Sequence, residues 1–201
     1  IQSFQPKHLI VLGRIHNESQ AENAVKQAHS AGLPTFNLDL MHGLPEQSVE
    51  NAMADLKQGI ELAPYHLSWY QLTIEPNTPF YSKPPALPDD DILWEIQEKG
   101  HSLLERAGYH QYEISGYAKA GHQCRHNLNY WRFGDYLGIG CGAHGKITDA
   151  ANGTIHRTVK VKHPRGYMEM SRPYLDTQTL VSADDLPFEF FMNRFRLVEP
   201  C

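Results

Sequence analysis

The alternation of helix-like and strand-like segments over the first two-thirds of the chain constrains its fold most strongly. Apolar residues at helical spacing predict helices over 17–32, 49–60 and 89–108, and short apolar runs predict strands over 35–40, 66–72 and 111–115. Strands and helices in this order are typical of parallel β/α units. Three such units cannot close a barrel, so we expect an α/β sheet that lacks some of its strands.

Local signals mark the ends of these helices. Asn17 and Gln20 match a capping box, and Gly32 supplies a C-terminal stop. Asp89, Asp90 and Asp91 bring negative charge to the start of the third helix, where the helix dipole favours it. The boundaries of these helices are therefore predicted from capping as well as from periodicity.

From about Gly116 the chain changes character, because Gly, His and aromatic residues become frequent. We predict strands over 136–139 and 146–148, a hairpin turn at Asn152-Gly153 and a return strand over 154–161. Helices are expected over 164–170 and 183–197. This part is predicted to be mixed α+β.

Composition excludes several classes of protein. The 201 residues carry a net charge of −5, which gives no overall attraction to nucleic acid or to an anionic membrane. The 3 Cys are too few for a disulfide framework, and no apolar run approaches the roughly 18 residues of a membrane span. A cytoplasmic location is expected. The chain begins at Ile1 without Met and stops at Cys201, so we also expect a piece of a longer protein.

Candidate ligands for metals and small molecules are scattered through the sequence. Asp39 ends a predicted parallel strand, where ligands of α/β folds commonly bind, although capping of the next turn would explain it equally well. Residues 140–145 fit G-x-G-x-x-G but precede a strand instead of opening a helix, so we reject a dinucleotide site. Cys124, His126, Cys141 and His144 could form a tetrahedral zinc site, but a buried, structural Cys141 is favoured.

The segment 126–131 (HNLNYW) sets an imidazole beside an amide and two large aromatic rings. These groups suit a flat, partly apolar ligand, with the His as an axial ligand of iron. From the residues alone, a loop whose aromatic side chains cover the edge of a domain is slightly favoured.

Seven segments, taken together and in order, resemble one family. They are 1–4 (IQSF), 12–16 (LGRIH), 37–45 (NLDLMHGLP), 66–76 (HLSWYQLTIEP), 112–115 (YEIS), 126–131 (HNLNYW) and 136–145 (YLGIGCGAHG). Over nearly the whole chain they resemble the radical S-adenosylmethionine family of haem chaperones and oxygen-independent coproporphyrinogen III oxidase-like proteins.

The resemblance implies the second part of an incomplete (β/α) barrel over residues 1–115 and a family-specific extension, truncated at its end, over 116–201. It also implies S-adenosylmethionine and a four-iron four-sulfur cluster as cofactors of the full-length protein. The family's Cys-x-x-x-Cys-x-x-Cys cluster motif has no counterpart among Cys124, Cys141 and Cys201. The chain alone is therefore expected to be unable to cleave S-adenosylmethionine.

Site residues carry over by position. In the family's pattern, Gln2, Arg14 and Asp39 resemble contacts to S-adenosylmethionine, with Asp39 as the ribose-binding carboxylate. The segment His126-Asn127-x-x-Tyr130-Trp131 resembles the signature of the haem-chaperone branch, in which the His contacts haem. The resemblance thus favours a haem site at the four residues His126, Asn127, Tyr130 and Trp131, and it implies no particular catalytic residue.

The resemblance implies a protein that binds haem and delivers it to acceptor proteins. The first alternative is radical-initiated oxidation of coproporphyrinogen III in porphyrin biosynthesis, and the second is a zinc-stabilised binding module. An incomplete barrel has an open sheet edge, so we also expect dimerisation to be available through that edge.

Overall fold

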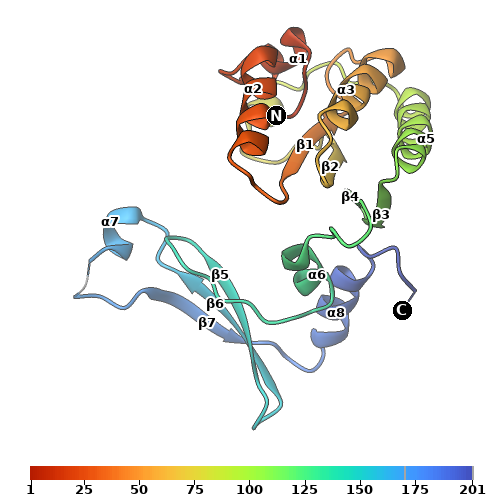
Figure 1. Ribbon diagram of the computed structural model, residues 1–201. Coiled ribbons are helices and arrows are strands. Elements are labelled where there is room, and N and C mark those ends of the chain that lie inside the picture. The colour runs from red at the N-terminus through yellow and green to blue at the C-terminus, as the bar shows by residue number, and fades with distance from the viewer. Residues whose placement is uncertain (170, 201) are drawn as a thin grey trace. The chain divides into compact units, whose positions relative to one another are not determined.

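The computed structural model describes residues 1–169 and 171–200, which form two compact units with a boundary between Cys124 and Arg125 (Figure 1). The first unit contains a four-stranded sheet in the order β1-β2-β4-β3. Its strands are β1 (Asn37–His42), β2 (His66–Gln71), β3 (His110–Glu113) and β4 (Gly116–Ala118). β1 and β2 are parallel, whereas β4 is antiparallel to both β2 and β3.

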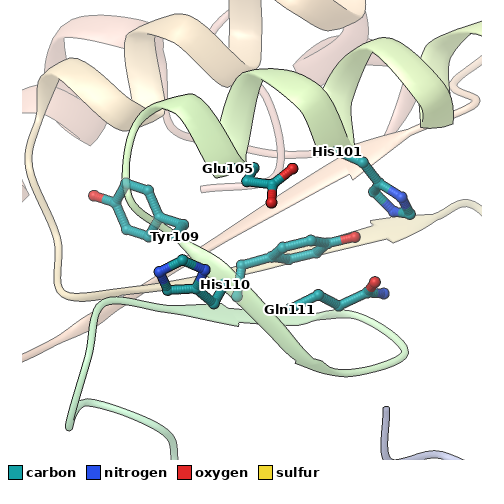
Figure 2. A pocket seen from close by; sticks show the side chains of 6 residues that line it. His101, Glu105, Tyr109, His110 and Gln111 are labelled. Carbon is teal, nitrogen blue, oxygen red and sulfur yellow. The ribbon is translucent and has the colours of Figure 1, made fainter.

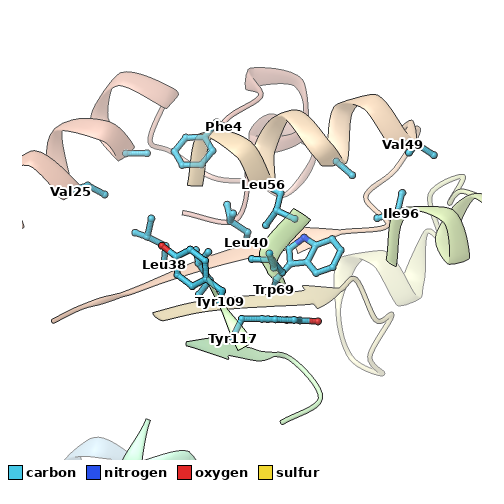
Figure 3. Close-up of a cluster of buried hydrophobic side chains, with 14 residues drawn as sticks. Phe4, Val25, Leu38, Leu40, Val49, Leu56, Trp69, Ile96, Tyr109 and Tyr117 are labelled. Atoms are coloured by element: carbon cyan, nitrogen blue, oxygen red, sulfur yellow. The ribbon is translucent and has the colours of Figure 1, made fainter. Parts of the chain in front are cut away.

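Helices cover one face of this sheet. The helices of the first unit are α1 (Pro6–Val11), α2 (Glu18–Ser30), α3 (Val49–Glu61), α4 (Pro79–Ser82) and α5 (Asp90–Arg106). Figure 3 shows the core between the helices and the sheet, where Leu40 of β1 and Trp69 of β2 meet Leu56 of α3 and Ile96 of α5. These four side chains are buried, and their transfer out of water is the main force that joins the two layers.

Close packing of α5 on the sheet depends on one glycine. A Cβ atom at Gly100 would lie 1.9 Å from the ring of Trp69. Because no larger residue fits between the helix axis and the indole, Gly100 lets α5 approach β2.

The second unit is built on an antiparallel sheet. β5 (His144–Asp149), β6 (Thr154–Lys160) and β7 (Leu175–Leu180) lie in that order, accompanied by α6 (Arg125–Trp131), α7 (Pro164–Tyr167) and α8 (Leu186–Arg194). Lys146 of β5 is buried, and its ammonium donates hydrogen bonds to the carbonyl of Phe133 and to Asp135 Oδ1, both over 2.9 Å. This paired charge ties β5 to the loop that follows α6.

Most of the predicted elements are confirmed. The helix after Asn17 has the expected capping box, since Gln20 N donates to Asn17 Oδ1 and Asn17 N donates to Gln20 Oε1. The parallel pair β1–β2 and the hairpin β5–β6 around Asn152-Gly153 are also present. The boundary predicted at 115–116 falls inside the turn of the β3–β4 hairpin.

Four expectations of secondary structure are wrong or incomplete. Residues 136–139 form no strand, because only Tyr136 makes an isolated bridge, to Lys146. The third predicted strand does not pair in parallel with the second, because β4 lies between β2 and β3 and is antiparallel to both. The last helix begins at Leu186 instead of 183, and β7 was not predicted. The helix expected over 164–170 spans Pro164–Tyr167, and its predicted end at 170 lies outside the described residues.

Among residues 1–169 and 171–200, no helix combines the length and apolar character needed to cross a lipid bilayer.

Candidate functional site

The face of the β1–β2 pair opposite the helices carries polar side chains. Successive residues of a strand point to opposite faces, so Asn37 and Asp39 of β1 lie on the face that does not carry Leu38 and Leu40. Their register partners on β2 are His66 and Ser68. Alternation in these two strands therefore puts an apolar layer on one side and a hydrogen-bonding surface on the other.

Asn37 organises this surface. Its Oδ1 accepts hydrogen bonds from Ser68 Oγ over 3.1 Å and from His66 Nδ1 over 2.7 Å, and its Nδ2 donates to Asp39 Oδ1 over 3.0 Å. Since Oδ1 of Asn37 can only accept, His66 Nδ1 must carry the proton. One oxygen of the half-buried Asp39 is thereby held in place.

The second nitrogen of His66 contacts a residue of β3, the strand beyond β4 in the sheet. His66 Nε2 lies 2.7 Å from the hydroxyl of Tyr112, and with Nδ1 protonated it accepts that hydroxyl's hydrogen. Burial lowers the pKa of His66, against an opposing effect of the Asp39 charge. The imidazole is therefore neutral near pH 7 and serves as a fixed link between β2 and β3.

Gln2 lies along the free side of β1. Its amide donates to the carbonyl of Asp39 over 2.7 Å, and its carbonyl accepts from the amide of Met41 over 2.8 Å, which makes a parallel bridge. The next two residues are held by Asp55 of α3, which accepts from Ser3 Oγ over 2.5 Å and from Phe4 N over 2.9 Å. Gln2 also has a φ of 76°, a left-handed conformation that is uncommon outside glycine.

All three predicted cofactor contacts affect the pKa of Tyr70 in β2. Burial raises the pKa of its hydroxyl, the Asp39 charge raises it further, and the Arg14 charge and a hydrogen bond with the Gln2 side chain lower it. Gln2, Arg14 and Asp39 thus all act on one phenol, although they come from three separate segments. Sequence reasoning missed Tyr70. Its even spacing from His66 and Ser68 along β2 is the signal that could have revealed it.

The predicted haem residues lie on α6 in the second unit. His126 is exposed, and its ring meets the ring of Tyr130 edge to face with centroids 4.5 Å apart. Trp131 packs under the guanidinium of Arg196, which lies 4.3 Å from the ring centroid, and Asn127 is half-buried on the same helix. α6 thus brings one accessible imidazole next to one large aromatic side chain, Tyr130, and carries Trp131 against Arg196.

The zinc set is divided between the units. Cys124 belongs to the first unit, while His126, Cys141 and His144 belong to the second. Within 1–169 and 171–200, no group of three or more His, Cys, Asp or Glu side chains could hold a metal ion. Cys141 is exposed, so its expected burial is wrong: the G-x-G-x-x-G segment forms a surface turn before β5.

Among the glycines of this segment, Gly145 allows a close approach. A Cβ atom at Gly145 would lie 2.7 Å from Thr158 Oγ1 and 3.1 Å from the amide nitrogen of Gly138, whereas one at Gly140 would meet nothing within 4 Å. No helix follows the turn. The segment therefore has neither the geometry nor the helix N-terminus of a dinucleotide site.

A pocket that no prediction anticipated lies between α5 and the β3–β4 hairpin. Figure 2 shows its lining, which is His101, Glu105, Tyr109, His110, Gln111 and Tyr117, around a volume of about 300 Å³. None of the predicted site residues contributes to it.

Similarity to known proteins covers almost the whole chain. The chain is 64% identical over 199 residues to "Heme chaperone HemW" of Escherichia coli strain K12. This match covers 99% of the chain and 52% of that protein. The chain is also 63% identical over 199 residues to "Heme chaperone HemW" of Haemophilus influenzae. This match covers 99% of the chain and 51% of that protein. No family model matches the chain.

A solved structure has the same fold. The structure titled "Coproporphyrinogen III oxidase (HemN) from Escherichia coli is a Radical SAM enzyme" matches with a TM-score of 0.78 and 19% identity, over 98% of this chain and 48% of that one. The predicted α/β class, as part of a radical SAM fold, is thus confirmed. The chain spans about half the length of the relatives it matches, and over nearly its whole length it is similar to the proteins named HemW.

Proposed function

We propose that this chain is part of a protein that binds haem and delivers it to acceptor proteins. The observation that carries the proposal is the exposed imidazole of His126 on α6, which meets the aromatic ring of Tyr130 on the helix that also carries Trp131. The relatives named heme chaperones support it, since they align with 99% of the chain.

The chemistry of these side chains suits a porphyrin. A neutral imidazole offers one lone pair to an axial position of haem iron, and large aromatic faces contact a flat macrocycle. Asn127 adds an amide group on the same helix. His126 is proposed as the iron ligand, with Tyr130, Trp131 and Asn127 as contacts.

We place the S-adenosylmethionine contacts on the polar face of β1 and β2. The half-buried Asp39 carboxylate suits hydroxyl donors such as those of a ribose, while Gln2 and the exposed Arg14 offer polar and cationic contacts. Tyr70 joins this proposed set. S-adenosylmethionine, when bound and reduced, supplies a carbon-centred radical.

The four-iron four-sulfur cluster does not fit this chain. The described residues contain the thiols of Cys124 and Cys141, one in each unit, whereas the family's Cys-x-x-x-Cys-x-x-Cys motif supplies three. We therefore propose that the chain alone does not cleave S-adenosylmethionine. Formation of deoxyadenosine by the purified 201-residue chain under reducing, anaerobic conditions would contradict this proposal.

Haem titration tests the haem site. Haem added to the purified chain is expected to give a saturable Soret change, and His126→Ala is expected to weaken binding at least tenfold. His163→Ala is the matched control, because His163 is also exposed in the second unit but precedes α7. Equal affinity of the wild-type chain and His126→Ala would refute the role of His126.

Oxidation of coproporphyrinogen III is the competing function, favoured by the shared fold with HemN. It requires the whole protein with its cluster. Protoporphyrinogen formed by the loaded full-length protein would support this function over haem delivery.

The sheet edge offers a further interaction. β3 is the last strand of the order β1-β2-β4-β3, so its outer edge has no strand partner among the described residues. We propose that two copies pair through this edge. Light scattering that finds only monomer at high micromolar concentration would rule the pairing out.

A further inference from the structure

We infer that Tyr136 and Arg157 are positioning residues that hold the His126 imidazole in the orientation needed to meet haem iron. They act through Tyr130, and the inference rests on the proposed haem site. Neither residue belongs to the HNLNYW segment: Tyr136 follows it in the loop before β5, and Arg157 is on β6.

A continuous series of contacts runs from the sheet to His126. Glu189 Oε2 of α8 accepts from Arg157 Nε over 3.0 Å and from Nη2 over 2.5 Å. Arg157 Nη1 donates to the hydroxyl of Tyr136 over 3.0 Å. The guanidinium is therefore fixed on both sides, and it fixes the phenol in turn.

Aromatic contacts continue the series. The ring of Tyr136 meets the ring of Tyr130 with centroids 4.4 Å apart and planes at 68°. Tyr130 meets His126 at 4.5 Å with planes at 90°. Edge-to-face pairs of this kind are favourable and directional, so the tilt of each ring limits the tilt of the next.

The backbone of Tyr136 is itself anchored. Its amide and carbonyl both pair with Lys146 of β5 over 3.0 Å, and Lys146 is buried. Tyr136 is thus a fixed point on the sheet, whereas α6 is a short helix without a buried residue. An isolated helix of this length is unstable in water, so its side chains depend on such contacts for their order.

Order of this kind affects ligand binding. A free histidine on an exposed helix samples several rotamers, and ligation of iron selects one of them at an entropic cost. Contact with Tyr130 reduces that cost before haem arrives. A single populated rotamer also gives a single geometry of the iron–imidazole bond.

Tyr136→Phe separates the two contributions, because it keeps the ring and removes the hydroxyl that Arg157 holds. Tyr136→Leu removes both. We expect haem affinity to fall about two- to threefold in Tyr136→Phe and about three- to tenfold in Tyr136→Leu, the range of an aromatic pair. The ferric low-spin signal should broaden or split in both variants. Arg165→Gln is the control, since Arg165 is in α7 and makes none of these contacts.

A double-mutant cycle distinguishes positioning from general structure. In the His126→Ala background, Tyr136→Leu should cause a smaller loss of affinity than in the wild-type chain, because no iron ligand remains to be positioned and only the Tyr130 contact can still change. Additive losses would overturn the inference and leave the haem site intact. Haem binding unaffected by His126→Ala would instead refute the proposed iron ligand, and the inference with it. Far-UV circular dichroism tests whether each variant is folded. If Tyr136→Leu is not folded, Tyr136→Phe takes its place in the cycle.

Discussion

Acidification below pH 6.5 is expected to destabilise the first unit through His42. This residue ends β1, is 4% exposed, and lies against Trp69 with ring centroids 4.3 Å apart. Its Nδ1 is buried and has no hydrogen-bond partner among the described residues. A proton on this ring would therefore have to be carried without a partner and next to an indole.

The magnitude follows from the pKa. Burial, assisted by the charge of His101, lowers the pKa of His42 from 6.5 to about 4. Between these two values the unfolded chain binds a proton that the folded chain does not, so stability rises with pH in this window and is lost as pH falls. The difference corresponds to about 3 kcal/mol of unfolding free energy between pH 6.5 and 4.

Two measurements check the effect of His42. Urea unfolding of the chain at several pH values should show that the free energy of unfolding falls between pH 6.5 and 4. In His42→Gln, whose side chain does not titrate in this range, that fall should be smaller by about 3 kcal/mol. The comparison with this variant is needed because burial also lowers the pKa of His8, His66 and His101 and raises that of Asp55. A direct NMR titration of His42 that gives a pKa of 6 or above would refute the reasoning.

Two further substitutions probe how the site is supported. Asp55→Ala removes the acceptor of two hydrogen bonds from Ser3 and Phe4 and should lower the free energy of unfolding by about 2–4 kcal/mol. Glu61→Ala, at the exposed end of α3, should change it by less than about 0.5 kcal/mol. Urea unfolding measures both variants, and equal effects would contradict the role of Asp55 in holding Ser3 and Phe4. Gly100→Ala should cost about 1–3 kcal/mol because its Cβ would overlap Trp69, although alanine favours helices by up to about 1 kcal/mol; a thermal scan in which this variant is stabilised would contradict the close packing.

Elements whose signals are local were predicted well. The capping box at Asn17 and the Asp89 cap, whose Oδ1 accepts from Ile92 N over 2.9 Å, involve side chains within one turn of the chain. The alternation of Leu38 and Leu40 with Asn37 and Asp39 likewise depends on neighbours alone. Such features are visible in sequence because the interacting groups are a few residues apart.

Elements whose stability comes from distant partners were predicted poorly. β7 is exposed throughout and is a strand because it pairs with β6, so its own residues carry little signal. The antiparallel return of β4 onto β2 is decided by pairing between segments far apart in the chain. Residues 136–139 are strand-like in composition but lack a second strand except at Tyr136.

The sequence by itself determined most of the helices and the parallel pair β1–β2, the family resemblance, and the candidate residues Asp39 and His126. The tertiary structure alone revealed that Gln2, Arg14 and Asp39 all affect the pKa of Tyr70. It alone also revealed that Arg157 holds Tyr136, whose ring meets that of Tyr130 beside His126. The physical reason is range. Capping and alternation act over a few residues, whereas the contacts that orient a binding side chain arise only when packing brings distant segments together.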